Sequence, residues 1–115
     1  MPFDRTLGVL QDIRHNIELA RSFSAGLTLS IFRADQKTVY AVIRCFEIIS
    51  EASRQLPSEL KERHPDIAWT DIAGAGSVYR HGYQHVREDI LWRTLQEGLE
   101  PLRQAVEAKI HRLEE

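Results

Sequence analysis

The stretch "TVYAVIRCFEIISEA", residues 38–52, decides the fold of this chain. Its apolar residues recur at intervals of three and four, which places them on one side of an α-helix. We expect this helix to start near Asp35 and to lie at the centre of the core, because its stripe is the strongest in the chain. The stripe comprises Val39, Val42, Ile43, Phe46, Ile49 and Ala52.

The segments on either side of this stretch also favour helices. An earlier helix is predicted to begin after Pro2, with Asp4 as its N-cap, and to end at Gly26. The segment "LTLSIFRAD", residues 27–35, is predicted to be a turn. After the central helix, Pro57 is a helix breaker and Ser58 is expected to cap a short helix over 58–64. The apolar stripe of the earlier helix comprises Leu7, Leu10, Ile13, Ile17 and Ala20.

A third long helix is predicted from about Thr70 to His81, with Ile72, Ala73 and Val78 facing inward. Gly74 and Gly76 lie within it, and each glycine costs a helix about 1 kcal/mol relative to alanine. Two glycines so close together indicate either close approach by another helix or a local break.

The last helix has an interruption in its pattern, because Pro101 removes a backbone hydrogen bond. It should kink there or begin a new first turn. We therefore predict an all-α, up-and-down bundle of four to five helices that forms a single domain over residues 1–115. The apolar positions of the last helix are Ile90, Leu91, Leu95, Leu99, Leu102, Val106, Ile110 and Leu113.

Composition and charge narrow the possible functions. The chain has 115 residues and a net charge of −2, so binding to a polyanion would need a local basic patch. The single cysteine, Cys45, excludes an intramolecular disulfide and a cysteine-rich zinc site, and its apolar setting predicts a buried thiol. No apolar run has the length of a signal peptide or membrane span, so we expect a cytoplasmic protein that does not enter the membrane.

The stretch "GSVYRHGYQH", residues 76–85, is the candidate for chemistry, and three interpretations compete. A zinc site over His81, His85 and Glu88 has too little support from further ligands, so no metal or cofactor is predicted. Acid–base work on RNA would use His81, whose ordinary pKa lies near 6.5, and a neighbouring arginine, Arg80. These two residues diverge by about 100° around a helix, so they face one groove only if it wraps the helix. The third interpretation is a solvated polar surface.

Five segments occur in an order that resembles the HepT-like branch of the HEPN superfamily. They are "LQDI", "IISEA", "HPDIAWTDIAG", "HGY" and "LWRTLQEGLEPL". The resemblance covers about residues 5–107 and implies a small all-α bundle that forms a homodimer. It also implies a toxin that cleaves RNA without a metal. The implied partner is a minimal nucleotidyltransferase antitoxin, which can adenylylate the toxin.

The family motif R-x-x-x-x-H-x-Y places its histidine at His81 and its tyrosine at Tyr83, the implied adenylylation site. The arginine position holds Gly76, and Ser77 stands where asparagine commonly follows. Arg80 either has taken over the phosphate contact or the site has lost catalysis. The first hypothesis is therefore a ribonuclease that uses His81 and Arg80. The second is a catalytically weak dimer that engages the nucleotidyltransferase. In both, Ser77 and His85 are supporting candidates.

Overall fold

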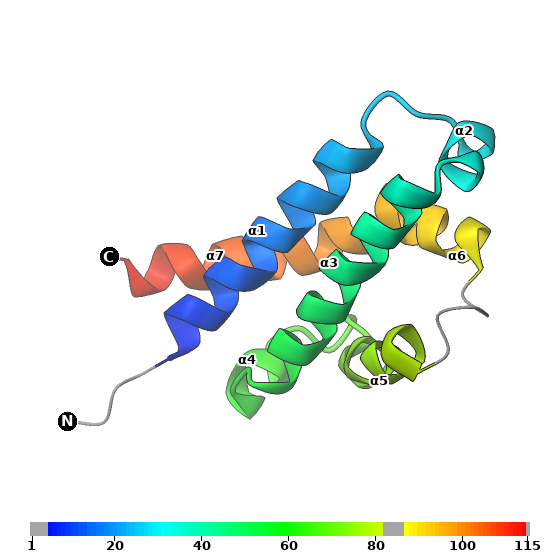
Figure 1. Ribbon diagram of the computed structural model, residues 1–115. Helices are drawn as coiled ribbons and strands as arrows, with labels where there is room; N and C mark the ends of the chain where they lie inside the picture. The colour runs from blue at the N-terminus through cyan, green and yellow to red at the C-terminus, as the bar shows by residue number, and fades with distance from the viewer. Residues whose placement is uncertain (1–4, 82–86, 115) are drawn as a thin grey trace.

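The computed structural model describes residues 5–81 and 87–114, and helices make up nearly all of this part of the chain (Figure 1). No strand occurs in these two ranges, so the all-α prediction is confirmed for them. The elements are α1 (Thr6–Ser24), α2 (Leu29–Ala34), α3 (Gln36–Arg54), α4 (Ser58–Glu62), α5 (Trp69–His81), α6 (Glu88–Arg93), a π-helical segment (Thr94–Gly98) and α7 (Leu99–Leu113).

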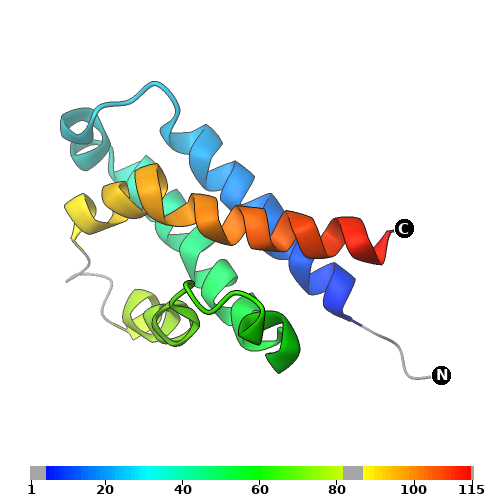
Figure 2. The same ribbon diagram turned by 180° about the vertical axis from the view of Figure 1, so that it is seen from behind.

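Helix α3 lies at the centre of the molecule, with α1 antiparallel beside it and α5 also packed against it (Figure 1). Its start is fixed by Asp35, which accepts hydrogen bonds from the Thr38 amide at 3.3 Å and the Thr38 hydroxyl at 2.7 Å. The whole predicted stripe of α3 is buried, and so are Leu10, Ile13, Ile17 and Ala20 of α1. Helix α7 covers the other side of α1, as the view from behind shows (Figure 2).

The predicted turn at 27–35 contains a helix instead. Thr28 caps α2 by accepting a hydrogen bond from the Ile31 amide at 3.2 Å. Phe32 is fully buried in α2, and its ring lies 5.3 Å from that of Trp92 in α6. The sequence interpretation missed α2 because its six residues owe their helical form to this distant aromatic contact.

The last predicted helix is divided into α6, the π-helical segment and α7. The Leu99 amide bonds to the Thr94 carbonyl, five residues back, and the Thr94 hydroxyl bonds to the Ile90 carbonyl at 3.0 Å. Pro101 lies in the first turn of α7, one of the two places predicted for it. Its missing amide interrupts the hydrogen-bond ladder at the wider turn. Ile90 and Leu113, two apolar positions of this divided element, lie near its ends and are exposed.

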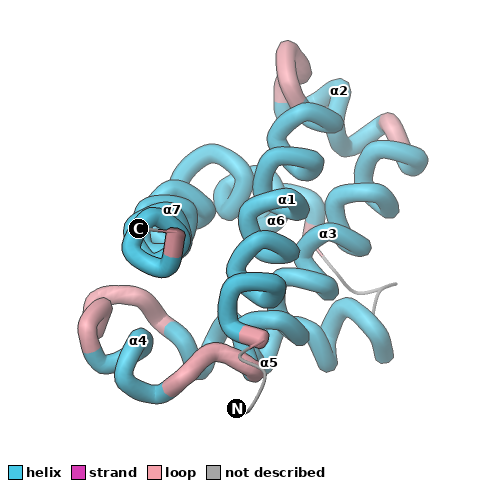
Figure 3. Tube along the Cα trace, turned by 90° about the vertical axis from the view of Figure 1, so that its left-hand side faces the viewer, coloured by secondary structure: helices cyan, strands magenta, loops and turns pink. Residues whose placement is uncertain are grey.

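The division of the last helix and the presence of α2 give more segments than the predicted four to five. The loops between the described helices up to α5 are short: residues 25–28, Asp35, 55–57 and 63–68 (Figure 3). Gly26 adopts a φ of +78° just after α1 ends, close to the predicted position. The cap of α4 is Pro57 and not Ser58, which is the first residue of that helix.

Two further expectations concern the core and the membrane. Cys45 is buried, as predicted, and burial raises the pKa of its thiol, which disfavours the reactive thiolate. Over the two described ranges, no helix combines the length and apolar content that crossing a bilayer requires.

Candidate functional site

Helix α5 carries the motif, and it ends at His81. The Trp69 indole donates a hydrogen bond to the His64 carbonyl at 3.0 Å and so anchors the start of the helix. Ile72 and Tyr79 pack against the core, whereas Val78 is 55% exposed. The inward placement of Val78 was therefore wrong: Tyr79, the next residue, faces the core and Val78 lies on the solvent side.

The predicted site residues fall partly inside the described structure. Arg80 and His81 lie in the last turn of α5, where the structure describes their backbone. Ser77 is exposed. Tyr83 and His85 lie outside the described residues. The predictions made for these two remain predictions.

Helical register divides the motif between two sides of α5. Position 81 lies four residues after Ser77 and seven after Gly74, and both of these residues are exposed. Position 80 lies four residues after Gly76, on the row that approaches α3. Positions 80 and 81 are therefore about 100° apart around the helix, the angle that the sequence indicated.

The arginine position of the motif is buried against α3. The Gly76 amide donates a hydrogen bond to the Ser50 hydroxyl at 2.9 Å, and that hydroxyl donates to the Ala73 carbonyl at 3.0 Å. The glycines of α5 were predicted to mark either close helix approach or a local break. Close approach is confirmed for Gly76, and the neighbouring helix belongs to the same chain.

Arg54 reaches the same turn of α5 from α3. Its Nε and Nη2 atoms donate to the Ala73 carbonyl at 3.2 and 2.9 Å, and its side chain is exposed. The sequence interpretation missed both Ser50 and Arg54. Their spacing of four residues places both on one face of α3, but it does not show that this face meets α5.

A groove of about 190 Å³ follows the seam between α3 and α5. Tyr40 is 60% exposed there, and Arg44 forms an ion pair with Glu47. The Tyr79 ring packs 6.1 Å from that of Phe46, and burial raises the pKa of its phenol. An aromatic ring and a guanidinium side by side are groups that bind single-stranded nucleic acid by stacking and by charge. The groove is lined by Tyr40, Ile43, Arg44, Glu47 and Tyr79.

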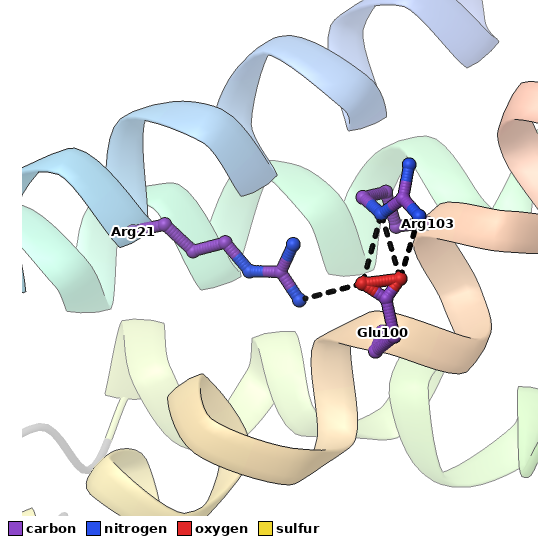
Figure 4. A network of polar contacts seen from close by, with 3 residues as sticks. All are labelled: Arg21, Glu100 and Arg103. Carbon is purple, nitrogen blue, oxygen red and sulfur yellow. Dashed lines mark hydrogen bonds and ion pairs between the residues drawn. The ribbon is translucent and has the colours of Figure 1, made fainter.

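A second polar cluster joins α1 to α7 (Figure 4). Arg103 donates from Nε to both carboxylate oxygens of Glu100, at 2.9 and 2.8 Å, and Arg21 reaches Glu100 at 3.4 Å. Hydrogen bonds from Arg103, together with the charges of Arg103 and Arg21, hold the pKa of Glu100 at about 2 despite desolvation. This cluster therefore ties α1 to α7, and none of its three residues belongs to α5.

The described residues contain no group of three histidine, cysteine, aspartate or glutamate side chains placed to hold a metal ion. The pair of His81 with His85 lies partly outside these ranges.

Comparison with known proteins matches residues 13–108 to the family described as "Ribonuclease HepT-like". The matched region runs from α1 to α7 and includes the "HGY" triplet. The chain belongs to this HepT-like family. This match confirms the resemblance that the five ordered segments indicated.

Relatives of this HepT-like chain carry names that refer to RNA cleavage. It is 38% identical over 94 residues to "Probable ribonuclease HepT" of Thermococcus cleftensis, which covers 82% of this chain and 86% of that protein. It is 32% identical over 98 residues to a protein named as a putative RNase from Caldanaerobacter subterraneus, covering 85% and 84%. A protein of the same kind of name from Methanocaldococcus jannaschii is 29% identical, covering 85% and 90%. No solved structure matches the chain.

Proposed function

We propose that this HepT-like chain is a metal-independent RNA endonuclease and the toxin of a pair with a minimal nucleotidyltransferase antitoxin. The observation that carries the proposal is the family match over residues 13–108, within which the chain keeps the "HGY" triplet at the end of α5. Because the proposed substrate is RNA, we expect the protein to act in the cytoplasm.

In the proposed reaction, His81 accepts the proton of an RNA 2′-hydroxyl while water protonates the leaving 5′-oxygen, or His81 donates that second proton while water accepts the first. The 2′-oxygen forms a bond to phosphorus as the bond to the 5′-oxygen breaks. The products are then a 2′,3′-cyclic phosphate and a free 5′-hydroxyl. Histidine suits both proton transfers because its ordinary pKa, near 6.5, is close to neutral pH. Arg80 would stabilise the negative charge that develops on the phosphorane oxygens.

A homodimer would bring these groups together. His81 and Arg80 of one chain lie on different rows of α5, so a shared cleft needs a second chain. A two-fold axis beside the exposed row of α5 would bring His81 of both protomers to one cleft, which the long side chain of Arg80 can reach around the helix. Exposed Val78, three residues before His81, supports an interface on this row.

Cleavage of a labelled pool of single-stranded RNA in the presence of EDTA tests the proposal. The wild-type chain should cleave, and His81→Ala should cleave about 100-fold more slowly or worse. His111→Ala is the matched control, because His111 is an exposed histidine of α7 and lies outside the motif. Equal loss in both variants, or cleavage that requires added metal, would contradict this mechanism.

Gly76 favours a second candidate function, a catalytically weak dimer that serves as the binding partner of the nucleotidyltransferase. The motif arginine is missing, and the position that would hold it is buried against Ser50. Under this alternative the wild-type chain cleaves none of the pool and still copurifies with the nucleotidyltransferase encoded beside it. Cleavage by the wild-type chain would rule the alternative out.

A further inference from the structure

The space beside Gly76 is already taken by a residue of another helix. A β-carbon at position 76 would lie 2.5 Å from Oγ and 3.0 Å from Cβ of Ser50. The next nearest atom is the Glu47 carbonyl oxygen, at 4.0 Å. Among the described residues, Ser50 is therefore the one that obstructs a β-carbon at position 76, because 4.0 Å is an ordinary van der Waals distance.

Ser50 is held firmly in this place. It is 2% exposed, and its hydroxyl uses its acceptor side for the Gly76 amide and its donor side for the Ala73 carbonyl. Rotating the hydroxyl away from position 76 would break both hydrogen bonds inside a buried seam. A buried polar group left without partners is unfavourable, so rotation is not an easy escape from the clash.

We propose that Ser50 and Gly76 are a matched pair, in which the Ser50 hydroxyl fills the space that an arginine at position 76 would need. Ser50 is thus a positioning residue: it fixes the motif half of α5 against α3 without the arginine. An arginine at position 76 needs at least the space of its β-carbon, which Ser50→Gly would release. The effect expected on RNA cleavage rests on the proposed ribonuclease function, whereas the effect expected on thermal stability does not.

A cycle of glycine and alanine variants tests the pair by thermal unfolding. Gly74→Ala is the matched control, because Gly74 lies in the same helix and a β-carbon added to it would meet no atom within 4 Å. Alanine there should raise the Tm by about 3–6 °C through helix propensity. Gly76→Ala should instead lower the Tm by about 5 °C or more through overpacking. In a Ser50→Gly background the same Gly76→Ala change should raise the Tm.

If Gly76→Ala shifts the Tm equally in the wild-type and Ser50→Gly backgrounds, the two positions are independent and the proposal of a matched pair is wrong. Ser50→Ala gives a graded second background, since its Cβ would still lie 3.0 Å from a side chain at position 76. There the Tm loss caused by Gly76→Ala should be smaller than in the wild type. If Ser50→Gly fails to fold, the Ser50→Ala background still tests whether Ser50 and Gly76 are a matched pair.

RNA cleavage supplies the readout that a purely structural role would not change. Gly76→Arg alone should give no gain, whereas Ser50→Gly/Gly76→Arg should cleave at least about tenfold faster than Ser50→Gly, since a restored phosphate donor acts on the transition state. If the Tm cycle is non-additive and no variant cleaves RNA, the pair stands and the ribonuclease proposal fails. If Gly76→Arg alone speeds cleavage and folds normally, the pair is overturned.

Discussion

At the residue scale, a ribonuclease without arginine at position 76 needs its positive charge from elsewhere. We expect Arg80→Ala to slow RNA cleavage by about 100-fold or more, as strongly as His81→Ala, with the dimer intact. Arg54→Ala is the comparison variant, because Arg54 already donates to the Ala73 carbonyl in the same seam. It should change the rate less than about threefold. Initial rates on one labelled RNA measure both, and a reversed order would assign the phosphate contact to Arg54.

Glu100 makes a pH-dependent contribution to stability. Its pKa falls from an ordinary value of 4.5 to about 2 in the folded chain, chiefly through hydrogen bonds from Arg103. A carboxylate with a lowered folded-state pKa stabilises the fold above about pH 4.5, and that contribution is lost as the pH falls toward 2. Glu100→Gln should therefore have a lower Tm than the wild type at pH 7, with the difference closing between pH 4.5 and 2. A difference that is the same at pH 7 and at pH 2 would contradict this.

The contact between Ser50 and Gly76 could not be predicted from the sequence. Helical spacing located the central stripe, and glycine spacing indicated close approach in α5. Nothing in the spacing identifies the partner of Gly76, because Ser50 lies 26 residues away and the contact depends on how α3 and α5 pack. The contact of Arg54 could not be predicted either, because it also depends on how α3 and α5 pack. The family resemblance singled out His81 and Tyr83 as site residues. Composition alone does not distinguish them from the other polar residues of this stretch.

At the element scale, long helices with unbroken stripes were predictable from local pattern alone. Helices α1 and α3 each bury nearly all the apolar positions expected of them. The errors fall where tertiary contacts override local pattern: α2 forms around Phe32, and Val78 is exposed because Tyr79 packs on Phe46. The π-helical segment was also missed, since its wider turn follows from Pro101 and the Thr94 back-bond acting together.

Helix α2 offers a test of this tertiary control. Phe32→Ala should lower the free energy of unfolding by about 3–5 kcal/mol, because the ring is fully buried against Trp92. Ile31→Ala in the same six-residue helix should change it by no more than about 0.5 kcal/mol, because Ile31 is 53% exposed. Urea denaturation measures both. Equal losses would mean that α2 contributes through its helix propensity and not through the buried ring.

At the scale of the whole molecule, the proposed homodimer determines whether the site can exist. The small residues of α5 cannot all serve a dimer interface, because Gly76 is already used against α3 of the same chain. The exposed row through Ser77 and Val78 is a part of α5 on which a second copy can pack. Position 81 lies four residues after Ser77 in α5, so a dimer that packs on this row would place its interface beside the proposed reaction.

Sedimentation equilibrium at micromolar concentration should therefore show a dimer, and Val78→Glu should convert it to monomer while leaving the helical circular-dichroism signal unchanged. Ile31→Glu is the matched control, since Ile31 is exposed to a similar extent on α2. It should leave the dimer intact. A wild-type chain that sediments only as a 13.3 kDa species would rule out the dimer and, with it, a cleft built from two chains.

The proposed antitoxin needs a tyrosine hydroxyl that its own active site can reach. Tyr79 is poorly suited, because its ring packs on Phe46 and burial raises the pKa of its phenol. Tyr83 follows Gly82 beyond the end of α5, outside the described residues, and is the tyrosine to which the family motif points. Incubation with ATP and the nucleotidyltransferase should add an adenylyl group that mass spectrometry maps to Tyr83. Tyr79→Phe should still be modified and Tyr83→Phe should not. An adenylyl group on Tyr79 would mean that the end of α5 must unpack from α3 for the partner to act.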